Sequence, residues 1–406
     1  MQPAASPNPL LCALDFASNW EIRGGVWRYG IELTRALVKL LGPEAVLLPV
    51  YDRLPPERLE EVAQTGGKLI ADGWHTRYDR LEAMAQRNGR FIPWKTVLPL
   101  VYGPKMKQRL FRSALGQANV CHAIFTCRGT PKHGVTVGTI HDLIPLLHET
   151  GAGFSKERFL SMIEDHRRWA TLVIVPSEAT KSDLIKHLNY PADQIRVVYH
   201  GIDTGLFHPN VALPDELLKK HDLKPGQFLL YVGALERRKN IERLIEAYHA
   251  AVGDRRDMPL VLSGSVVHDL PRLKEALGDG SGRVRHIGYV TDDDLPGLYR
   301  AARALVHVAV AEGFGFTPPE AMACGTPVVT ARQTATGEVV GEAGLLVDAF
   351  SINEIAKGIR TIIGDNAVHA QLSSLGKIRA AGFTWRRCAE QTYAVYQEAW
   401  QRRSPT

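Results

Sequence analysis

Two glutamates separated by a glycine-rich stretch are the clearest candidates for chemistry. Residues 304–330 read ALVHVAVAEGFGFTPPEAMACGTPVVT, so Glu312 follows an apolar run and Glu320 comes eight residues later. Gly313 and Gly315 allow the backbone to approach a ligand, and the free amides at the start of the following helix suit a pyrophosphate. Carboxylates accept hydrogen bonds from pairs of sugar hydroxyls. We therefore predict that one glutamate holds a transferred sugar and the other a ribose.

A structural interpretation of Glu320 stands beside the functional one. The segment predicts a helix that begins near Thr317, is preceded by an apolar strand over 304–310, and ends at Gly325. An acid in the first turn of a helix interacts favourably with the helix dipole. Taken alone, Glu320 therefore fits either role, whereas the whole segment favours a ligand site.

The elements around this segment alternate between short apolar runs and helical patterns. Expected strands cover 10–16, 136–141, 172–176, 195–198, 228–232, 259–263, 283–287, 304–310 and 327–330. Unbroken apolar runs are typical of parallel strands covered on both faces by helices, such as the helix expected over 241–252. The pattern predicts an α/β fold.

Domain organisation follows from a proline-bearing stretch over 207–226, which contains one short charged helix and reads as a linker. We expect a first domain over 1–207, a second over 208–385, and a final helix over 386–406 for which both domains stay open, with packing back on the first domain as one of the two arrangements. A chain of 406 residues fits two domains.

Composition excludes several classes of protein. The chain has a formal charge of +6, and its five cysteines show neither a disulfide framework nor zinc spacing. A net charge of this size is weaker than we expect of a nucleic-acid binder. Gly25 and Gly30 have Walker-like spacing, but Ile31 and Glu32 stand where lysine and a hydroxyl residue are required. No GxGxxG fingerprint of a nicotinamide oxidoreductase follows a strand.

The Glu312–Glu320 segment resembles the Glu-x7-Glu signature of glycosyltransferase family 4, whose fold is GT-B. The resemblance runs in family order from about residue 22 to about residue 348. It implies two facing Rossmann-like domains with a cleft between them, and retention of anomeric configuration. It also implies catalytic roles for Glu312 and for His141, which stands in a His-Asp-Leu-x-Pro element.

The donor site that the resemblance implies draws on both domains. Arg238 and Lys239, in YVGALERRKN, are expected on the diphosphate, although Ala234 stands where many members have arginine. The remaining expected donor-binding residues are Gly24, Gly25, Tyr289, Val290, Phe314, Gly315, Phe316, Thr317 and Glu320. We expect no cofactor and no metal: Thr291 followed by Asp292–Asp294 reads as an ordinary helix start.

The expected reaction moves a hexose, mannose from GDP-mannose as the first choice, to a glycan or lipid-linked glycan. A UDP-sugar donor such as UDP-glucose is the alternative within the same reaction, and a non-catalytic nucleotide-sugar sensor is the alternative of a different class. Residues 88–112 are basic and aromatic, which suits either a peripheral membrane contact or a solvated wall of the cleft. The expected location is the cytoplasm, at the inner face of the plasma membrane if that contact forms.

Overall fold

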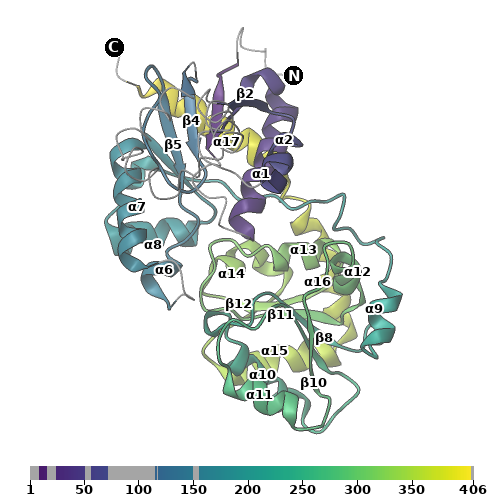
Figure 1. The fold of residues 1–406 in the computed structure, drawn as a ribbon. Helices are drawn as coiled ribbons and strands as arrows, with labels where there is room; N and C mark the ends of the chain where they lie inside the picture. The colour runs from purple at the N-terminus through teal and green to yellow at the C-terminus, as the bar shows by residue number, and fades with distance from the viewer. Residues whose placement is uncertain are drawn as a thin grey trace, which may run out of the picture.

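A computed structural model of the chain describes residues 9–15, 24–50, 56–71, 115–116, 118–149 and 155–403. Figure 1 shows two bodies, each built on its own sheet with helices around it. Every described strand pair in both sheets is parallel. The alternation of strands and helices in the sequence therefore predicted the sheet type correctly.

The first sheet has seven strands in the order β3-β2-β1-β4-β5-β6-β7. Their bounds are β1 Cys12–Asp15, β2 Val46–Val50, β3 Lys68–Ala71, β4 Val120–Ala123, β5 Val135–Thr139, β6 Leu172–Val175 and β7 Ile195–Val197. The strand order reverses between β1 and β4. In open parallel sheets, ligands bind beyond the carboxyl ends of the strands at such a reversal.

The helices around the first sheet begin and end at recognisable signals. Gly24, at φ +85°, precedes α1 (Gly25–Leu41), and the side chains of Ser155 and Ser177 cap α7 (Lys156–Trp169) and α8 (Glu178–Leu188). The other described helices here are α2 (Pro56–Ala63) and α6 (Ile144–Leu147). The last helix of the chain, α17 (Trp385–Gln401), returns to pack against α1 and the first sheet (Figure 1).

The second sheet has six strands in the order β10-β9-β8-β11-β12-β13. Their bounds are β8 Leu229–Val232, β9 Leu260–Ser263, β10 Val284–Gly288, β11 Ala304–His307, β12 Val328–Ala331 and β13 Leu345–Val347. The order reverses between β8 and β11, so the loops that follow these two strands meet at one edge of the sheet. These loops carry Arg238 and Lys239 on one side and Glu312 on the other.

Helices of the second body cover both faces of its sheet. Their bounds are α10 Ile241–Val252, α11 Pro271–Gly278, α12 Leu295–Ala301, α13 Thr317–Ala323, α14 Ala335–Val340, α15 Ile352–Gly364 and α16 Asn366–Ala380. A short helix, α9 (Asp215–Lys220), lies in the connecting stretch, as the charged pattern there predicts. One buried cluster packs α10 and α15 against the sheet, and another packs α12 and α13 against the opposite face.

The chain crosses between the two bodies twice, and the crossings lie side by side. Ile202 on the first crossing pairs with Thr384 on the second, and the amide of Ile202 donates to the carbonyl of Phe383 at 2.9 Å. The two connections are therefore hydrogen bonded to each other where the bodies join.

Two predicted element ends are wrong, one because of a contact with another loop and one because of a turn before the helix. The strand expected over 304–310 ends at His307, because the amide side chain of Asn240 binds the carbonyl of Val308 at 3.0 Å and draws the chain away. The helix expected to start after Thr291 begins at Leu295. The Thr291 hydroxyl accepts from the Asp294 amide at 3.4 Å and donates to the Asp294 carboxylate at 3.3 Å, so both bonds lie within the turn that precedes the helix.

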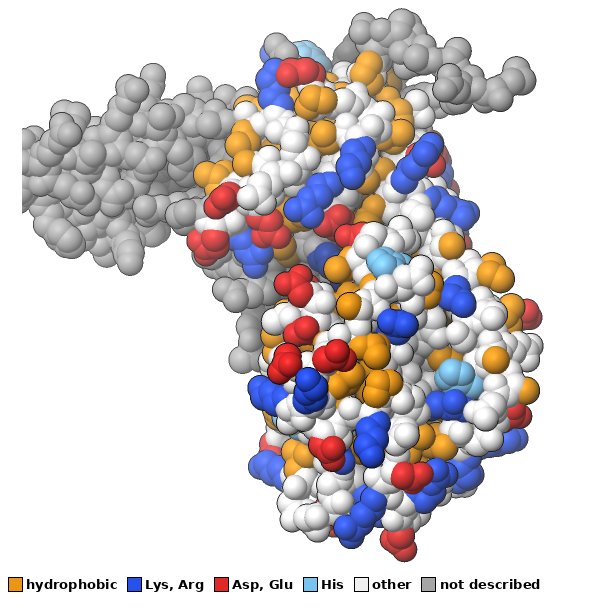
Figure 2. Space-filling model, turned by 90° about the vertical axis from the view of Figure 1, so that its right-hand side faces the viewer, with side chains coloured by type: hydrophobic (Ala, Val, Ile, Leu, Met, Phe, Trp, Pro, Cys, Tyr) orange, Lys and Arg blue, Asp and Glu red, His pale blue; other side chains and the backbone are white. Residues whose placement is uncertain are grey.

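The surface carries charges of both signs. On the face drawn in Figure 2, basic and acidic side chains are interspersed over the second body rather than gathered by sign. That face therefore offers no extended basic surface of the kind that follows a nucleic-acid backbone.

Candidate active site

A cavity of about 330 Å³ lies between the two bodies and brings together most of the residues that the sequence singled out. Loops beyond the carboxyl ends of both sheets form its walls, as expected for open parallel sheets. Nine of the predicted residues line it: Gly25, His141, Arg238, Lys239, Glu312, Phe314, Gly315, Phe316 and Thr317. Asp142, His200 and His307 line it too, although the sequence had suggested no role for them.

Glu312 is the most strongly held charge in this cavity. Its carboxylate bonds the ammonium of Lys239, the guanidinium of Arg238 at 3.3 Å and Nε2 of His307 at 3.1 Å. Burial alone would raise the pKa of Glu312, but Lys239, His307 and Arg238 outweigh it and hold that pKa well below its usual range. Glu312 is therefore a fixed anion at neutral pH, with an orientation set by three partners.

His307 was missed because it ends β11 inside an apolar run, where a lone histidine usually packs in the core. Its ring bridges Glu312 and Thr317, whose hydroxyl lies 3.3 Å from Nδ1. The feature that could have identified His307 as a site residue is its position, at the carboxyl end of a strand and five residues before Glu312. His307 therefore joins the two ends of the predicted donor loop.

The basic loop after β8 is anchored on the same side of the cavity. Arg238 has a 13% exposed side chain, donates to the carbonyl of Ala311 at 2.7 Å, and forms an ion pair with Glu236. The Arg238 carbonyl accepts from the amide of Val310 at 2.9 Å. Both cations predicted for the diphosphate thus lie in the cavity wall, and each is paired with a carboxylate.

Two glycines in the loop after Glu312 are required by close contacts. A Cβ on Gly313 would lie 2.1 Å from the carbonyl oxygen of His141 in the other body. The Gly313 carbonyl accepts a 2.8 Å hydrogen bond from Ser177 of the first body. Gly315 has φ +76°, and a Cβ there would lie 2.3 Å from the Thr336 side chain. The loop fits between the bodies only with glycine at both positions.

His141 enters the cavity wall from the first body as a neutral ring. The ring is 9% exposed and packs edge-on against Tyr29, with the two ring centroids 5.2 Å apart. Its Nε2 lies 2.8 Å from the carbonyl oxygen of Ile124. A carbonyl only accepts, so Nε2 carries the proton and Nδ1 is left as an acceptor. Burial lowers the pKa of His141 to about 4. This ring can therefore accept a hydrogen bond from a hydroxyl at neutral pH.

Four predicted donor-binding residues lie outside the cavity lining: Gly24, Tyr289, Val290 and Glu320. Gly24 precedes α1, while Tyr289 is 73% exposed and Val290 is buried after β10. Glu320 is 1% exposed and is paired with Arg28, a residue for which we predicted no role. These two residues are separated by 292 positions in the chain, so no local pattern pointed to their contact.

A third carboxylate ties the bodies together beside the cavity. Glu338, in α14, accepts hydrogen bonds from the amides of Glu178 and Ala179 at 2.8 and 2.9 Å, and from the Tyr199 hydroxyl at 2.6 Å. It therefore caps the N-terminus of α8 from the opposite body, where an anion interacts favourably with the helix dipole. Glu338 thus makes three hydrogen bonds between the bodies outside the lining of the cavity.

A second cavity of about 300 Å³ adjoins the first. It lies between α6, α8 and the loop before α14, and shares Asp142, Ile144 and Glu312 with the first cavity. Its remaining walls include His148, Asp183 and Gln333. The two cavities therefore meet at Asp142, Ile144 and Glu312.

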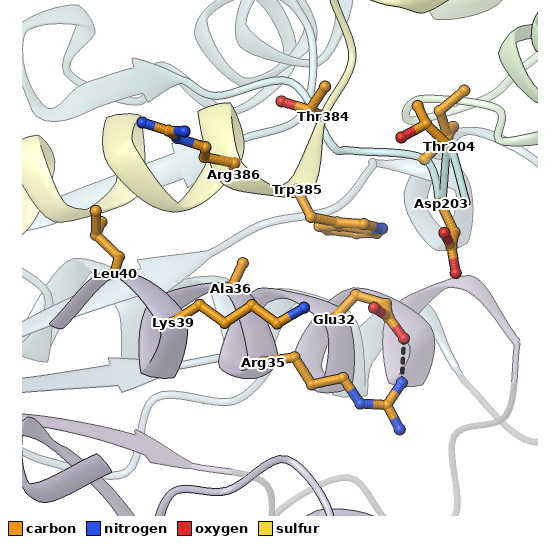
Figure 3. A pocket seen from close by; sticks show the side chains of 11 residues that line it. Glu32, Arg35, Ala36, Lys39, Leu40, Asp203, Thr204, Thr384, Trp385 and Arg386 are labelled. Carbon is orange, nitrogen blue, oxygen red and sulfur yellow. Dashed lines mark hydrogen bonds and ion pairs between the residues drawn. The ribbon is translucent and has the colours of Figure 1, made fainter. Parts of the chain in front are cut away.

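Figure 3 shows a larger groove, of about 630 Å³, on the side of the molecule where the two connections cross. The indole of Trp385 lies between α17 and the Glu32–Lys39 face of α1, and Asp203 and Thr204 close one end. Trp385 also contacts Phe316 of the donor loop, with ring centroids 6.2 Å apart. The joint between the bodies is therefore packed directly behind the active-site cavity.

The described parts of the chain contain no group of three or more histidine, cysteine or acidic side chains placed to hold a metal ion. They also contain no helix that is both long and apolar enough to span a bilayer. The basic and aromatic stretch 88–112 lies outside the described residues.

Comparison with known proteins agrees with this geometry. Residues 23–206 match the family model described as Glycosyltransferase Family 4, and residues 215–379 match that of Glycosyl transferases group 1. The O-antigen chain mannosyltransferase B of Escherichia coli is 35% identical over 393 residues, covering 92% of this chain and 96% of that protein. A D-inositol 3-phosphate glycosyltransferase of Arthrobacter is 31% identical, over 57% of this chain and 56% of its own length.

Solved structures share the arrangement of the two bodies. Anabaena HepE, crystallised with UDP and glucose, superposes with a TM-score of 0.70 at 19% identity, covering 95% of this chain and 99% of its own. WaaG, a glycosyltransferase involved in lipopolysaccharide biosynthesis, gives 0.61 at 17% identity over 95% and 99%. The fold is GT-B, two facing Rossmann-like domains, as the sequence predicted. With this fold and a relative that is similar over nearly its whole length, the chain belongs to glycosyltransferase family 4.

Proposed function

We propose that this enzyme transfers mannose from GDP-mannose to a glycan or lipid-linked glycan during synthesis of a cell-surface polysaccharide, with retention of anomeric configuration. The donor choice is supported by the relative named as an O-antigen chain mannosyltransferase, which is similar along 96% of its length. The observation that carries the assignment of the site is Glu312, a buried anion held by two cations and a histidine in the cavity between the domains.

In the proposed reaction, the bond between C1 of the sugar and the diphosphate oxygen breaks, and its electron pair leaves with the diphosphate. The acceptor hydroxyl oxygen bonds to C1 on the same face, and its proton passes to the departing phosphate oxygen. Arg238 and Lys239 stabilise the charge that develops on the diphosphate. Much of the rate enhancement then comes from orientation and from fixed charges.

Glu312 acts in this scheme by holding the hydroxyls of the sugar. Its lowered pKa suits an acceptor of hydrogen bonds and makes it a poor proton donor at neutral pH. His141, neutral and with Nδ1 as an acceptor, orients a hydroxyl of the sugar or of the acceptor from the opposite wall. Glu320 receives the ribose hydroxyls, and backbone near Tyr289 and Val290 contacts the base.

We propose that the reaction needs no bound metal. The support is the donor set: Arg238 and Lys239 supply two positive charges beside the cavity, and Asp292 and Asp293 are exposed in a turn outside the cavity lining. Transfer should therefore proceed at an undiminished rate in EDTA.

The test is a thermal-shift panel of GDP, UDP, ADP and their common sugars, with and without EDTA, followed by a transfer assay with the nucleotide that stabilises. A ligand at 100 times its dissociation constant adds about 2.7 kcal/mol of stability, which is readily seen. Selective stabilisation by GDP and GDP-mannose, unchanged by EDTA, supports the proposal. Stabilisation by UDP alone would instead indicate a UDP-sugar as the donor, the alternative supported by the HepE complex with UDP and glucose.

A non-catalytic sensor of nucleotide sugars is the alternative of a different class. It would be stabilised by the same ligands but would leave the donor intact during prolonged incubation with lipid-linked glycans. The presence of both His141 and Glu312 in one cavity favours the enzyme.

The acceptor is proposed to meet the enzyme at an anionic membrane surface, through residues 88–112. The composition of this stretch supports that contact, since basic and aromatic side chains together favour the interface of an anionic bilayer. Flotation with liposomes that contain anionic lipid tests it, and equal recovery with and without these lipids would remove the membrane from the proposal.

A further inference from the structure

The ion pair between Arg28 and Glu320 joins the two domains at the carboxylate proposed for the ribose. Arg28 lies in the first two turns of α1, and its Nη1 is 2.5 Å from Oε1 of Glu320 in α13. The Tyr299 hydroxyl lies 3.2 Å from the other oxygen, Oε2. Both oxygens of Glu320 are therefore occupied by protein donors.

Aromatic rings fix the guanidinium in this position. The Cζ atom of Arg28 lies 5.2 Å from the ring centre of Phe316, in the donor loop, and 5.6 Å from that of Phe207, at the end of the first connection. A guanidinium over an aromatic face is stabilised electrostatically. Arg28 thus contacts two separate parts of the chain outside its own helix, α13 with its N-cap Phe316 and the stretch at Phe207.

The burial of the pair is uneven. The side chain of Glu320 is 2% exposed, whereas that of Arg28 is 33% exposed. Phe316 and Thr317, on either side of the start of α13, line the active-site cavity, but Glu320 does not. A hydroxyl that approaches Glu320 therefore has to displace a covering group, and Arg28 is the covering group with access to solvent.

We propose that Arg28 is a latch on the donor site. Its guanidinium pairs with the carboxylate proposed for the ribose, and binding of a nucleoside diphosphate exchanges this ion pair between domains for hydrogen bonds from the ribose hydroxyls. This inference rests on the proposed function, since it needs Glu320 to bind the ribose. The released guanidinium leaves Phe207 and Phe316, so occupation of the ribose site is communicated to α1 of the first domain.

A latch of this kind weakens nucleotide binding. The observed dissociation constant equals the intrinsic one divided by the fraction of molecules with a free Glu320. Removing the guanidinium raises the fraction of molecules with a free Glu320 toward one. The buried carboxylate of Glu320 then lacks its charged partner, and the ribose hydroxyls are the donors that satisfy it best. Loss of Arg28 is therefore expected to tighten nucleotide binding, the opposite of what loss of an ordinary ligand residue does.

The test compares wild type with Arg28→Gln by calorimetric titration of GDP and of UDP, together with melting temperatures of the free and nucleotide-saturated proteins. Arg35→Gln is the matched control, because Arg35 lies on the same helix and, among the residues that the structure describes, forms its ion pair with Glu32, one turn away in that helix. We expect Arg28→Gln to bind the preferred nucleotide at least about fivefold more tightly, and the control to bind like wild type. Free Arg28→Gln should melt lower than wild type, and saturation should raise its melting temperature by more.

A second variant keeps the test decisive if Arg28→Gln does not fold. Arg28→Lys keeps the positive charge but cannot present a planar group to both phenylalanine rings, so it should bind the nucleotide with intermediate affinity. Unchanged or weaker nucleotide binding in both variants would overturn the latch and leave Arg28 a structural or ligand-binding residue. If wild type, control and variants all fail to bind any nucleoside diphosphate, the donor site itself is wrong and the latch falls with it.

Discussion

Mild acid should destabilise this enzyme through histidines buried in its first domain. His122, His141 and His166 are all buried, and burial lowers the pKa to about 3 for His122 and to about 4 for the other two. His122 is held between the hydroxyls of Tyr396 and Thr139, each at 2.7 Å. These rings are neutral in the folded protein well below the pH at which they become charged in an unfolded chain.

The sign and size of the effect follow from proton linkage. An unfolded histidine titrates near pH 6.5, so between about pH 6.5 and pH 4 the unfolded chain binds more protons than the folded one. Stability therefore falls as the pH falls through this window. At pH 5 each of the three rings should remove about 2 kcal/mol, or about 6 kcal/mol together, relative to pH 7.5. Total unfolding free energies are typically only 5–15 kcal/mol.

Two buried carboxylates, Asp142 and Glu320, act in the opposite direction, so a comparison of variants is needed. Burial raises the pKa of Asp142 and of Glu320, which favours the folded state as the pH falls. His122→Gln removes one titrating ring and leaves these groups in place. The control is His133→Gln, at an exposed position in the same domain.

The assay is urea unfolding, followed by tryptophan fluorescence and circular dichroism at four pH values from 7.5 to 5.0. The loss of unfolding free energy over this range should be smaller for His122→Gln than for wild type, by about 2 kcal/mol, while His133→Gln should follow wild type. Equal losses for wild type and His122→Gln would refute the reasoning, because they would mean that His122 becomes protonated in the folded state.

Three further predictions concern the cavity and its support. Glu312→Gln should lower kcat by about 100-fold or more with little change in nucleotide affinity, because it removes a fixed charge beside the reacting sugar; Glu236→Gln is the control, and similar losses in both would point to general damage of the loop. Gly313→Ala should push the domains apart, since its Cβ would lie 2.1 Å from the His141 carbonyl oxygen, and an unchanged radius of gyration in solution scattering would contradict this. Tyr396→Phe should cost about 1 kcal/mol of stability by removing a buried hydrogen bond, and an unaltered melting temperature would show that another group takes its place.

The fold was predictable because its signals are local. Apolar runs with parallel-sheet character, glycine at helix ends and a charged helix in the linker each depend on a few neighbouring residues. The predicted end of the strand over 304–310 was wrong because it depends on a contact from another part of the chain. β11 stops at His307 because Asn240, on a different loop, binds the next carbonyl, and no pattern within 304–310 contains that information.

The candidate site likewise contains residues that local sequence could predict and residues that it could not. Glu312, Gly313 and Gly315 could be predicted because they lie within four residues in a loop whose position beyond a strand follows from the pattern. Arg28 could not, because its partner lies 292 residues away and the two meet only when the domains face each other. His307 and His200 resemble ordinary core histidines in the sequence, and only the geometry of the cavity distinguishes them.

The return of α17 to the first domain has a consequence for how the protein is made. Buried residues of this helix, among them Ala389, Val395 and Tyr396, share a core with strands β1, β4 and β5. During synthesis the amino-terminal domain therefore leaves the ribosome before α17, which completes its core, has been made. About 200 further residues must be synthesised before α17 can pack on the first sheet. At 5–20 residues per second this takes roughly 10–40 s, during which apolar side chains of the unfinished sheet are exposed to chaperones. The second domain, by contrast, has all of its strands before residue 348 and can complete its fold first.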